Sequence, residues 1–342
     1  MEEIRKILKT LCSCPTASSR ETTEFNAINT LASPYFDLIE TDTVGNIILT
    51  KLSGKDNAKK LLIDAHFDVI GLMVTKIHKN GFLSVTNVGG VDARILPSSE
   101  VTIHGKEDVY GIVVSTPPHL KGKDTSVPKI DSILIDTGYK KEDLEKIVSI
   151  GDTITINGEY METQNGYVVS SFLDNRSCAA SVIHGIAFTD RKDLQYDVYL
   201  SISAGEEVGR QPSRVALFNI EPDVVITTDV NFAREPGIEI RDSIECKKGP
   251  SVDISTLIDR KFARSIINLA KENGIPCQVV VEPMGTGTNN DPLAITGKGA
   301  RYAVMSLPLK SMHTNCESVN LEDVLNLSKL ISLIAKTEES ML

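Results

Sequence analysis

The segment YDVYLSISAGEEVGR (residues 196–210) places two adjacent glutamates at the end of an apolar run. Residues 196–204 have the length and composition of a buried strand, and a small-residue turn then carries Glu206 and Glu207. Two buried carboxylates side by side are costly to remove from water unless a strong positive charge lies close by. One or two metal ions would supply that charge, with one glutamate as a ligand and the other free to accept a proton.

Other continuous apolar runs predict strands that are covered on both faces, and helical periodicity occurs between them. This alternation predicts an α/β domain with a mostly parallel central sheet flanked by helices. We expect strands at 46–52, 60–66, 196–204, 222–229, 277–282 and 302–309, and helices at 2–13, 20–33, 175–189, 260–273 and 321–336.

The stretch from residue 70 to residue 165 has a different pattern. It is rich in Gly, Pro, Thr and Val, has turn signals such as VGGVD (88–92), and offers one helix candidate, at 140–148. Short strands separated by turns predict a small β-barrel or sandwich. We therefore expect a β-barrel domain at 70–165, inserted into a main domain formed by 1–69 and 166–342.

Composition limits the class of protein and its partners. With 342 residues, 41% hydrophobic and 24% charged, the chain is expected to form a globular protein of two domains. The net charge of −10 argues against nucleic acid or an anionic membrane surface as a partner. No apolar run approaches 18 residues, and residues 2–13 form an amphipathic helix pattern and not a secretion signal. We expect a cytoplasmic protein whose six cysteines are reduced.

Side chains able to bind metal or move protons follow the predicted strands where these end, and one opens a helix. Because open α/β sheets bind ligands at the carboxyl ends of their strands, several strands would bring these side chains to one edge. Histidine and carboxylate groups are the ligands that a divalent metal site requires. Each residue alone has an ordinary alternative, such as an N-cap for an aspartate, but their joint position favours a metal centre. They are His66, Asp68, Asp174, Glu206, Glu207, Asp229 and His313.

Other chemistries find less support in the sequence. The chain lacks the G-x-S-x-G motif of nucleophile-elbow hydrolases and the P-loop motif. The segment MGTGTNN (284–290) is rich in glycine but lacks the Rossmann fingerprint. Residues 283–292 therefore either form an ordinary loop near the site or help to shape a substrate pocket.

An ordered set of motifs resembles the tetrahedral-aminopeptidase or glutamyl aminopeptidase family of dinuclear metallopeptidases, some of whose members are labelled cellulase or endoglucanase. The likeness covers roughly residues 5–335. The motifs are AHFDVIG (65–71), GGVDARILPSSEVTIHG (89–105), STPPHL (115–120), FLDNRSC (172–178), SAGEEVG (203–209), PDVVITTDV (222–230) and MHTNCESVNLEDV (312–324).

The resemblance implies a zinc-peptidase-like fold and an aminopeptidase that hydrolyses N-terminal residues from short peptides with a water activated by two metals. It implies that His66 and Asp229 bind the first ion, that Glu207 and His313 bind the second, and that Asp174 bridges both. The ions are most often zinc or cobalt, and the sequence does not decide between them.

The resemblance also implies roles for the two remaining acids and for the inserted domain. Glu206 would be the general base, and Asp68 would orient His66. The β domain would control access to the site and assemble the chain into a homo-oligomer, in which dimers form shells of twelve subunits.

Some residues depart from the family pattern and leave the substrate preference open. Val69 stands where an acid is common, and Asn289 stands where an acid is expected. The segment before His313 lacks the aromatic residue that is often found there. A cation in the pocket would favour acidic substrates, although each candidate has an alternative as a surface or intersubunit charge; the candidates are Arg210, Arg234, Arg241 and Lys310.

Two alternatives to the peptidase stay open. A glycoside hydrolase could use two carboxylates, but adjacent glutamates tied to metal are poorly placed to flank a sugar bond. The chain also has no Trp on which a sugar could stack. A non-catalytic, metal-binding assembly protein is the other alternative, and Glu206 argues against it because a structural site needs no spare base.

Overall fold

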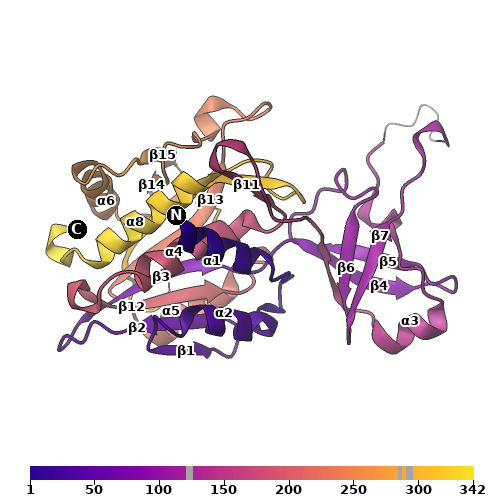
Figure 1. Cartoon of the computed structure of the whole chain (residues 1–342), viewed down its shortest axis with the longest axis horizontal. Helices are drawn as coiled ribbons and strands as arrows, with labels where there is room; N and C mark the ends of the chain where they lie inside the picture. The colour runs from indigo at the N-terminus through magenta and orange to yellow at the C-terminus, as the bar shows by residue number, and fades with distance from the viewer. Residues whose placement is uncertain (121–125, 284–286, 290–295) are drawn as a thin grey trace.

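The apolar runs of the sequence form one large sheet at the centre of the main domain (Figure 1). The computed structural model describes residues 1–120, 126–283, 287–289 and 296–342. The strands of this sheet are β1 (Leu38–Thr41), β2 (Ile47–Lys51), β3 (Lys59–His66), β12 (Tyr196–Ser203), β13 (Val224–Phe232), β14 (Ser251–Ser255), β15 (Gln278–Glu282) and β16 (Arg301–Leu309). Their order is β1–β2–β12–β3–β13–β16–β14–β15, and β12, β3, β13 and β16 run parallel to one another.

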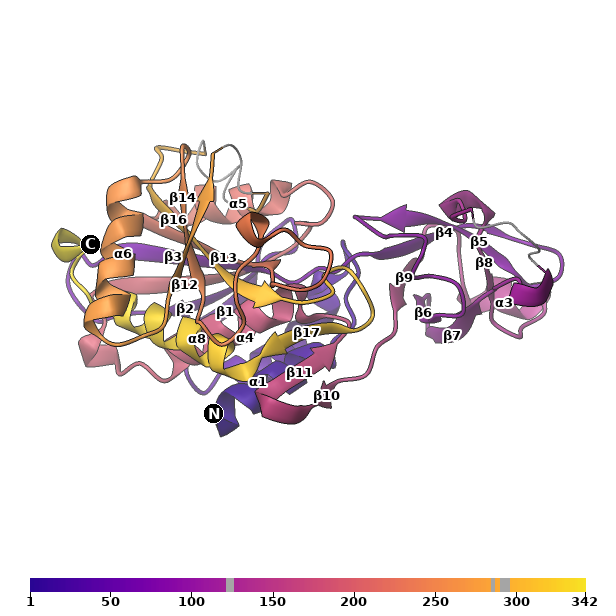
Figure 2. The same ribbon diagram turned by 90° about the horizontal axis from the view of Figure 1, so that it is seen from above.

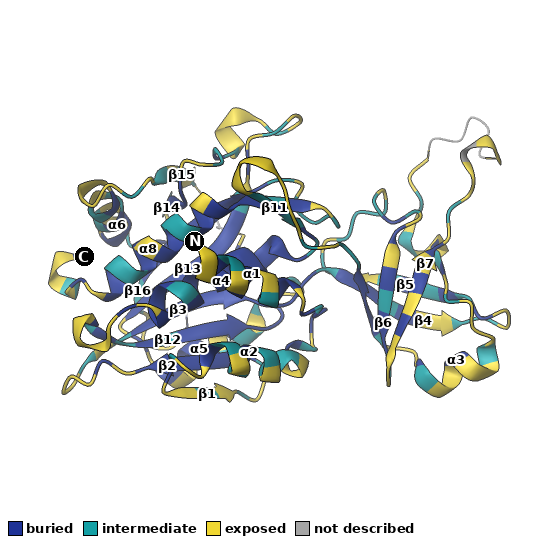
Figure 3. Cartoon of the chain, in the orientation of Figure 1, coloured by how far each residue is buried: buried dark blue, intermediate teal, exposed yellow. Residues whose placement is uncertain are grey.

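Helices cover both faces of the sheet, which explains why its central strands are apolar along most of their length. Figure 2 shows α1 (Glu2–Cys12), α4 (Leu173–Ala187) and α8 (Leu321–Ala335) on one side and α5 (Gln211–Ile220) on the other. α6 (Arg260–Glu272) packs against β14 and β16, and α2 (Phe25–Ala32) packs against α1. Figure 3 shows the central strands buried beneath helices whose outer faces are exposed.

The second domain is a closed barrel with a core of its own, and it projects from one end of the α/β domain (Figure 1). Its strands are β4 (Gly71–Ile77), β5 (Leu83–Val88), β6 (Glu100–His104), β7 (Asp108–Val113), β8 (Leu134–Asp136) and β9 (Thr153–Ile156), and the barrel order is β4–β5–β8–β7–β6–β9. Buried and exposed residues alternate along β7, as expected for a strand with one face in the barrel core. α3 (Lys141–Ile147) lies between β8 and β9 and buries Leu144.

After the barrel, the chain returns to the main domain through a small three-stranded sheet. It is formed by β10 (Met161–Glu162), β11 (Tyr167–Ser170) and β17 (Glu317–Asn320), with β11 in the middle. Ser170 at the end of β11 pairs with Glu317 at the start of β17. This pairing brings the start of α4 next to the segment that follows β16, and Asp174 contacts Glu317, 143 residues later in the chain.

The fold class expected from the sequence is confirmed: an α/β domain with a largely parallel sheet and an inserted β-barrel. The barrel strands span Gly71 to Ile156, inside the range that we expected for the insert. In the large sheet and the helices that cover it, the sequence missed α5, β1 and β14. α5 is a short helix that begins with Gln211-Pro212, and β14 alternates apolar residues with Ser251, Asp253 and Ser255, which gave no continuous apolar run.

Other expectations can be compared with the structure directly. The helix expected at 20–33 is divided into a 3₁₀ turn, Glu21–Glu24, followed by α2. All six cysteines are free thiols. Within the described ranges, no helix has both the length and the apolar character needed to cross a bilayer.

A close approach between α4 and α8 depends on a glycine. A Cβ atom at Gly185 would lie 2.6 Å from the Ser328 carbonyl oxygen and 3.2 Å from Ile331 Cγ2. Real contacts of this kind do not occur at 2.6 Å, so one helix would have to move. Glycine is therefore required for these two helices to pack as closely as they do.

We expect Gly185→Ala to lower the free energy of unfolding by about 1–3 kcal/mol, because it overpacks this contact. At an exposed helix position the same change raises the free energy of unfolding by up to about 1 kcal/mol. The sign of the change therefore distinguishes a tight helix contact from an open position. Chemical denaturation would measure it, with Lys329→Ala on the exposed side of α8 as a control that should change stability by less than about 0.5 kcal/mol. A neutral or stabilising Gly185→Ala would contradict this packing.

Candidate metal centre

Five of the predicted site residues converge at the carboxyl edge of the sheet. His66 ends β3, and Asp229 lies near the end of the parallel neighbour β13. Asp174 lies at the start of α4, Glu207 in the turn after β12, and His313 in the loop after β16. Their ligand atoms form two groups that share Asp174, and within each group the atoms all lie within 4.8 Å of one another.

The first group consists of His66, Asp174 and Asp229, all of them buried. His66 Nε2 lies 3.0 Å from Asp174 Oδ1 and 3.6 Å from Asp229 Oδ1. One ring nitrogen and two carboxylate oxygens thus face a common point. This is a ligand set of the kind that zinc and similar ions accept.

The second group consists of Asp174, Glu207 and His313. His313 Nε2 lies 3.4 Å from Asp174 Oδ2 and 3.5 Å from Glu207 Oε1. Asp174 therefore turns one carboxylate oxygen toward each histidine. A carboxylate in this position can bridge two cations, which in two-metal sites lie about 3.5–4 Å apart.

A polar atom without a hydrogen bond shows that these residues fit a cation. Asp174 Oδ1 is buried and has no hydrogen-bond donor assigned among the described residues, although His66 Nε2 lies 3.0 Å from it. Burial also raises the pKa values of Asp229 and Glu207, and the neighbouring Asp174 carboxylate adds to both shifts. Positive charge at this point would satisfy the bare oxygen and favour the ionised carboxylates.

Glu206 stands beside these ligands without belonging to either group. Its carboxylate is buried, and Oε1 accepts a hydrogen bond of 2.8 Å from Arg210 Nε. Burial raises the pKa of Glu206 to about 8, and the charges of Asp229 and Glu207 contribute to the increase. A carboxyl group with a pKa close to neutrality is suited to accept and return a proton.

Asp68 is fully buried, and its carboxylate makes its shortest contacts with groups other than His66. It accepts hydrogen bonds from the backbone N–H groups of Glu206 (2.9 Å) and Glu207 (3.1 Å) and from the Ser18 hydroxyl (2.6 Å). The nearest partner of His66 Nδ1 is the Asp68 carbonyl oxygen at 3.1 Å, whereas Oδ1 lies 3.6 Å away. Asp68 thus contacts His66 mainly through its backbone and holds the two glutamates through its side chain.

Two residues that the sequence analysis did not identify fix the same turn. Glu21 is buried and accepts the Gly205 N–H at 3.0 Å, and the Asn46 side chain accepts the Ala204 N–H at 3.0 Å. Gly205 has a φ of +61°, a conformation that glycine adopts at little cost. Three polar side chains far apart in sequence therefore determine where Glu206 and Glu207 lie, and no local sequence signal indicates them.

Glu317 is a further residue of the site that the sequence analysis missed. It is 2% exposed, and its two carboxylate oxygens accept the backbone N–H of Asp174 at 3.0 Å and of His313 at 2.9 Å. His313 has a φ of +61°, which a residue with a side chain adopts only when its surroundings hold it there. One carboxylate thus positions both the shared ligand Asp174 and His313 of the second group. The available signal was an acid at the first position of an otherwise buried strand.

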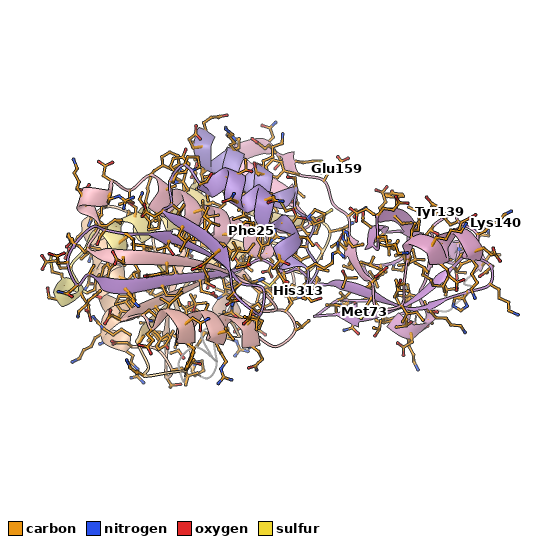
Figure 4. All side chains as sticks on the ribbon, turned by 90° about the horizontal axis from the view of Figure 1, so that it is seen from below. Phe25, Met73, Tyr139, Lys140, Glu159 and His313 are labelled. Carbon is orange, nitrogen blue, oxygen red and sulfur yellow. The ribbon has the colours of Figure 1, made fainter. Side chains whose placement is uncertain are left out.

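The barrel domain reaches this site through the two glycines of the VGGVD turn. A Cβ at Gly90 would lie 3.1 Å from His313 Nδ1, and one at Gly89 would lie 3.3 Å from the Glu207 Cβ. Figure 4 shows His313 on the side of the α/β domain that faces the barrel. The inserted domain therefore contributes a wall to the metal centre.

A cavity of about 580 Å³ opens beside the two groups of ligands. Of the four basic candidates, Arg210 and Arg241 line it. Arg210 pairs with Glu206, and Arg241 is 79% exposed and pairs with Glu239 (3.1 Å) and Asp242 (3.4 Å). Arg234 and Lys310 do not line the cavity; Arg234 pairs with Glu245, and Lys310 lies 4.9 Å above the ring of Tyr167.

Two of the three departures noted in the sequence, Asn289 and Val69, are buried residues in the structure. Asn289 is buried, and its amide donates to Asp64 Oδ2 at 2.7 Å and to Ser203 Oγ at 2.9 Å. At the loop position where an acid was expected, Asn289 therefore donates a hydrogen bond to Asp64, an acid on β3. Val69 is buried, and its N–H donates to the Thr16 carbonyl at 3.1 Å. Within the segment 283–292, Pro283, Gly287 and Thr288 line the cavity, and residues 284–286 and 290–292 lie outside the described residues.

Comparison with known proteins identifies the family. The model of the M42 glutamyl aminopeptidase family matches residues 45–330, which is most of the chain. The chain belongs to this family. Its enzymatic class follows: it is an aminopeptidase, a hydrolase that acts on peptide bonds, and the M42 peptidases are metallopeptidases.

Individual M42 relatives and solved structures agree over nearly the full length. A lysyl aminopeptidase from Pyrococcus furiosus is 33% identical over 314 residues, which cover 89% of this chain and 88% of the relative. An aminopeptidase from the archaeon Desulfurococcus kamchatkensis has a TM-score of 0.91 at 26% identity, covering 98% of this chain and 95% of its own. The TET1 peptidase of Pyrococcus horikoshii has a TM-score of 0.86 at 27% identity, covering 97% and 99%.

These findings confirm the family resemblance, the fold and the aminopeptidase prediction. They support the peptidase over the glycoside hydrolase and over a non-catalytic assembly protein.

We expect Glu317→Gln to weaken metal binding by about 10- to 100-fold, the range found when a partner that orients metal ligands is lost. A glutamine offers a single oxygen and places an N–H₂ group against one of the two backbone donors. Titration of the metal-free protein with zinc against a competing chelator would measure the change. Glu322→Gln, an exposed change on the same segment, is the matched control. Unchanged affinity in Glu317→Gln would show that the carboxylate does not position the ligands.

Proposed function

We propose that this protein is a dinuclear metallo-aminopeptidase that releases N-terminal residues from short peptides. The observation that carries the proposal is the orientation of Asp174, whose two carboxylate oxygens face the Nε2 atoms of two different histidines. A structural site for one ion needs no such bridge, and it needs no uncoordinated acid such as Glu206 beside it.

In this proposal each of the two groups of ligands holds one metal ion. His66 and Asp229 would hold one ion, Glu207 and His313 would hold the other, and Asp174 would hold both. The mixed nitrogen and oxygen donors suit zinc or cobalt. When bound, the two ions supply Lewis acidity that polarises the scissile carbonyl and lowers the pKa of water.

The chain's own residues would handle the protons. Glu206 would take a proton from the attacking water and deliver it to the leaving amine. Its Oε1 is held by Arg210, which leaves Oε2 as the oxygen for this transfer. The Asp68 carbonyl near His66 Nδ1 favours a proton on that nitrogen, so Nε2 keeps its lone pair for an ion. The Asp68 carboxylate would keep Glu206 and Glu207 in place through their N–H groups.

A larger assembly forms part of the proposal. The TET1 peptidase of Pyrococcus horikoshii is described as assembling into a tetrahedron or a large octahedral shell. The barrel of this chain projects from the α/β domain and also touches the site through Gly89 and Gly90, so it could both join subunits and limit access (Figure 1). We propose dimers that assemble to a dodecamer, in the cytoplasm, where its free cysteines would stay reduced.

The two adjacent glutamates should respond differently to the same substitution. We expect Glu206→Gln to keep two metal ions per chain and to lose about 10²–10⁴-fold in kcat, because a general base is removed. Glu207→Gln should bind the second ion more weakly, because it loses a ligand. Metal analysis and turnover of aminoacyl-p-nitroanilides after reloading with zinc or cobalt would test both. Full turnover in Glu206→Gln would rule out its role as the base.

Assembly can be tested by sedimentation velocity. We expect a particle of about twelve chains of 37.3 kDa each. A species of 37.3 kDa alone, at concentrations at which the enzyme is active, would contradict the assembly proposal.

A further inference from the structure

The proposed function does not define which N-terminal residue is preferred. One wall of the cavity carries residues that could select it. This wall is built from β14 and β15, at the end of the sheet away from β1. Asp253 of β14 and Glu282 of β15 both line the cavity, together with the metal ligands. Asp253 is 2% exposed and Glu282 is partly buried. Two acids therefore face the space that a substrate side chain would occupy.

The strand register places Asp253 on the same face as the metal ligands. Asp229 of β13 pairs with Ser306 of β16, and Ser306 pairs with Ser251 of β14. Side chains directly paired across strands point to the same face, and so do residues two apart along a strand. Asp253, two residues after Ser251, thus shares the face of Asp229.

The distance between these residues suits a long side chain. Two strand spacings of about 4.8 Å and a shift of two residues put the backbones of Asp253 and Asp229 on the order of 12 Å apart. Glu282 pairs with Ser255 across β14 and β15, so it lies on the same face, one strand and two residues farther from Asp229 than Asp253 does. A peptide whose terminus is held at the metal centre could reach both acids only through an extended side chain.

One carboxylate oxygen of Asp253 also lacks a hydrogen-bond donor. Its Oδ1 is buried and has no hydrogen-bond donor among the described residues. Burial and the nearby charge of Glu282 raise the pKa of Asp253 to about 7. A buried acceptor without a donor is costly. A donor that reaches Asp253 from the cavity would therefore lower the free energy of the site. A cationic donor gains most, because it also relieves the repulsion from Glu282.

The two arginines that line the cavity form ion pairs with acids other than Asp253 and Glu282. Arg210 pairs with Glu206, and Arg241 pairs with Glu239 and Asp242 at the exposed edge. In the described part of the chain, no ion pair joins a lysine or arginine to Asp253 or Glu282. The two acids also belong to neither of the metal-binding groups formed by the described residues. The cation that they lack would therefore come from a substrate.

We propose that Asp253 and Glu282 select peptides whose N-terminal residue is lysine or arginine. This inference rests on the proposed aminopeptidase function and names its substrate class. The methylene stem of such a side chain would cross the apolar part of the cavity, where Pro283 and Met312 lie. Its charged end would meet Asp253 and then Glu282, whereas an acidic side chain would be repelled by both.

The test compares lysyl, arginyl, norleucyl, leucyl and glutamyl p-nitroanilides with the zinc- or cobalt-loaded enzyme. Norleucine keeps most of the lysine stem but lacks the ammonium group, so the ratio of kcat/KM for lysine over norleucine isolates the charge. We expect this ratio to be at least about 10 in the wild-type enzyme and to fall by about 10-fold or more in Asp253→Asn/Glu282→Gln. Each single variant should fall between the two, and the partly buried Glu282→Gln informs even if Asp253→Asn fails to fold.

Glu272→Gln is the control, because Glu272 is exposed at the end of α6, does not line the cavity and should leave the ratio unchanged. A wild-type enzyme that cleaves norleucyl or glutamyl substrates as well as lysyl ones would overturn the proposal. So would variants in which lysine and norleucine fall together, the result expected if Asp253 bound the substrate's α-ammonium group. A metal-loaded enzyme that cleaves none of the substrates would instead refute the proposed aminopeptidase function.

Discussion

The structure depends on one electrostatic constraint: several carboxylates are held together, largely out of water, at one edge of a sheet. Asp174, Glu207 and Asp229 lie within a few ångströms of two histidines, and Glu206 lies beside them. Like charges in a poorly solvated site repel strongly, so this arrangement is stable in its ionised form only when cations share the space. Asp174 Oδ1 is the clearest case, because it is buried and no hydrogen bond compensates its negative charge.

Much of the surrounding polar structure serves to aim these groups. Asp68 and Glu21 fix the turn that carries the two glutamates, and Glu317 links the backbones of Asp174 and His313. The inserted barrel adds Gly89 and Gly90 against the same residues. The site is therefore a junction of segments from both domains, with residues positioned by the sheet and the small β11–β17 pairing and a wall added by the barrel.

The sequence predicted the fold and the five candidate ligands because both have local signals. Apolar runs mark the strands, and His66, Glu207 and Asp229 stand where those strands end. It missed Glu317, and it missed Asp253 on β14, because each is a single acid whose meaning depends on partners distant in sequence. Asn289 looked like a lost acid, and only the folded chain shows that it faces Asp64 on β3. The contacts of the Asp68 carboxylate with the glutamate turn were likewise inaccessible from spacing alone.

The central claim is that two ions sit on either side of Asp174. Anomalous X-ray diffraction at the zinc edge, from crystals of the zinc-loaded protein, tests it most directly. The account predicts two peaks about 3.5–4 Å apart, one next to His66 and Asp229 and the other next to Glu207 and His313, with an Asp174 oxygen on each. A single peak, or peaks that Asp174 does not contact, would contradict it.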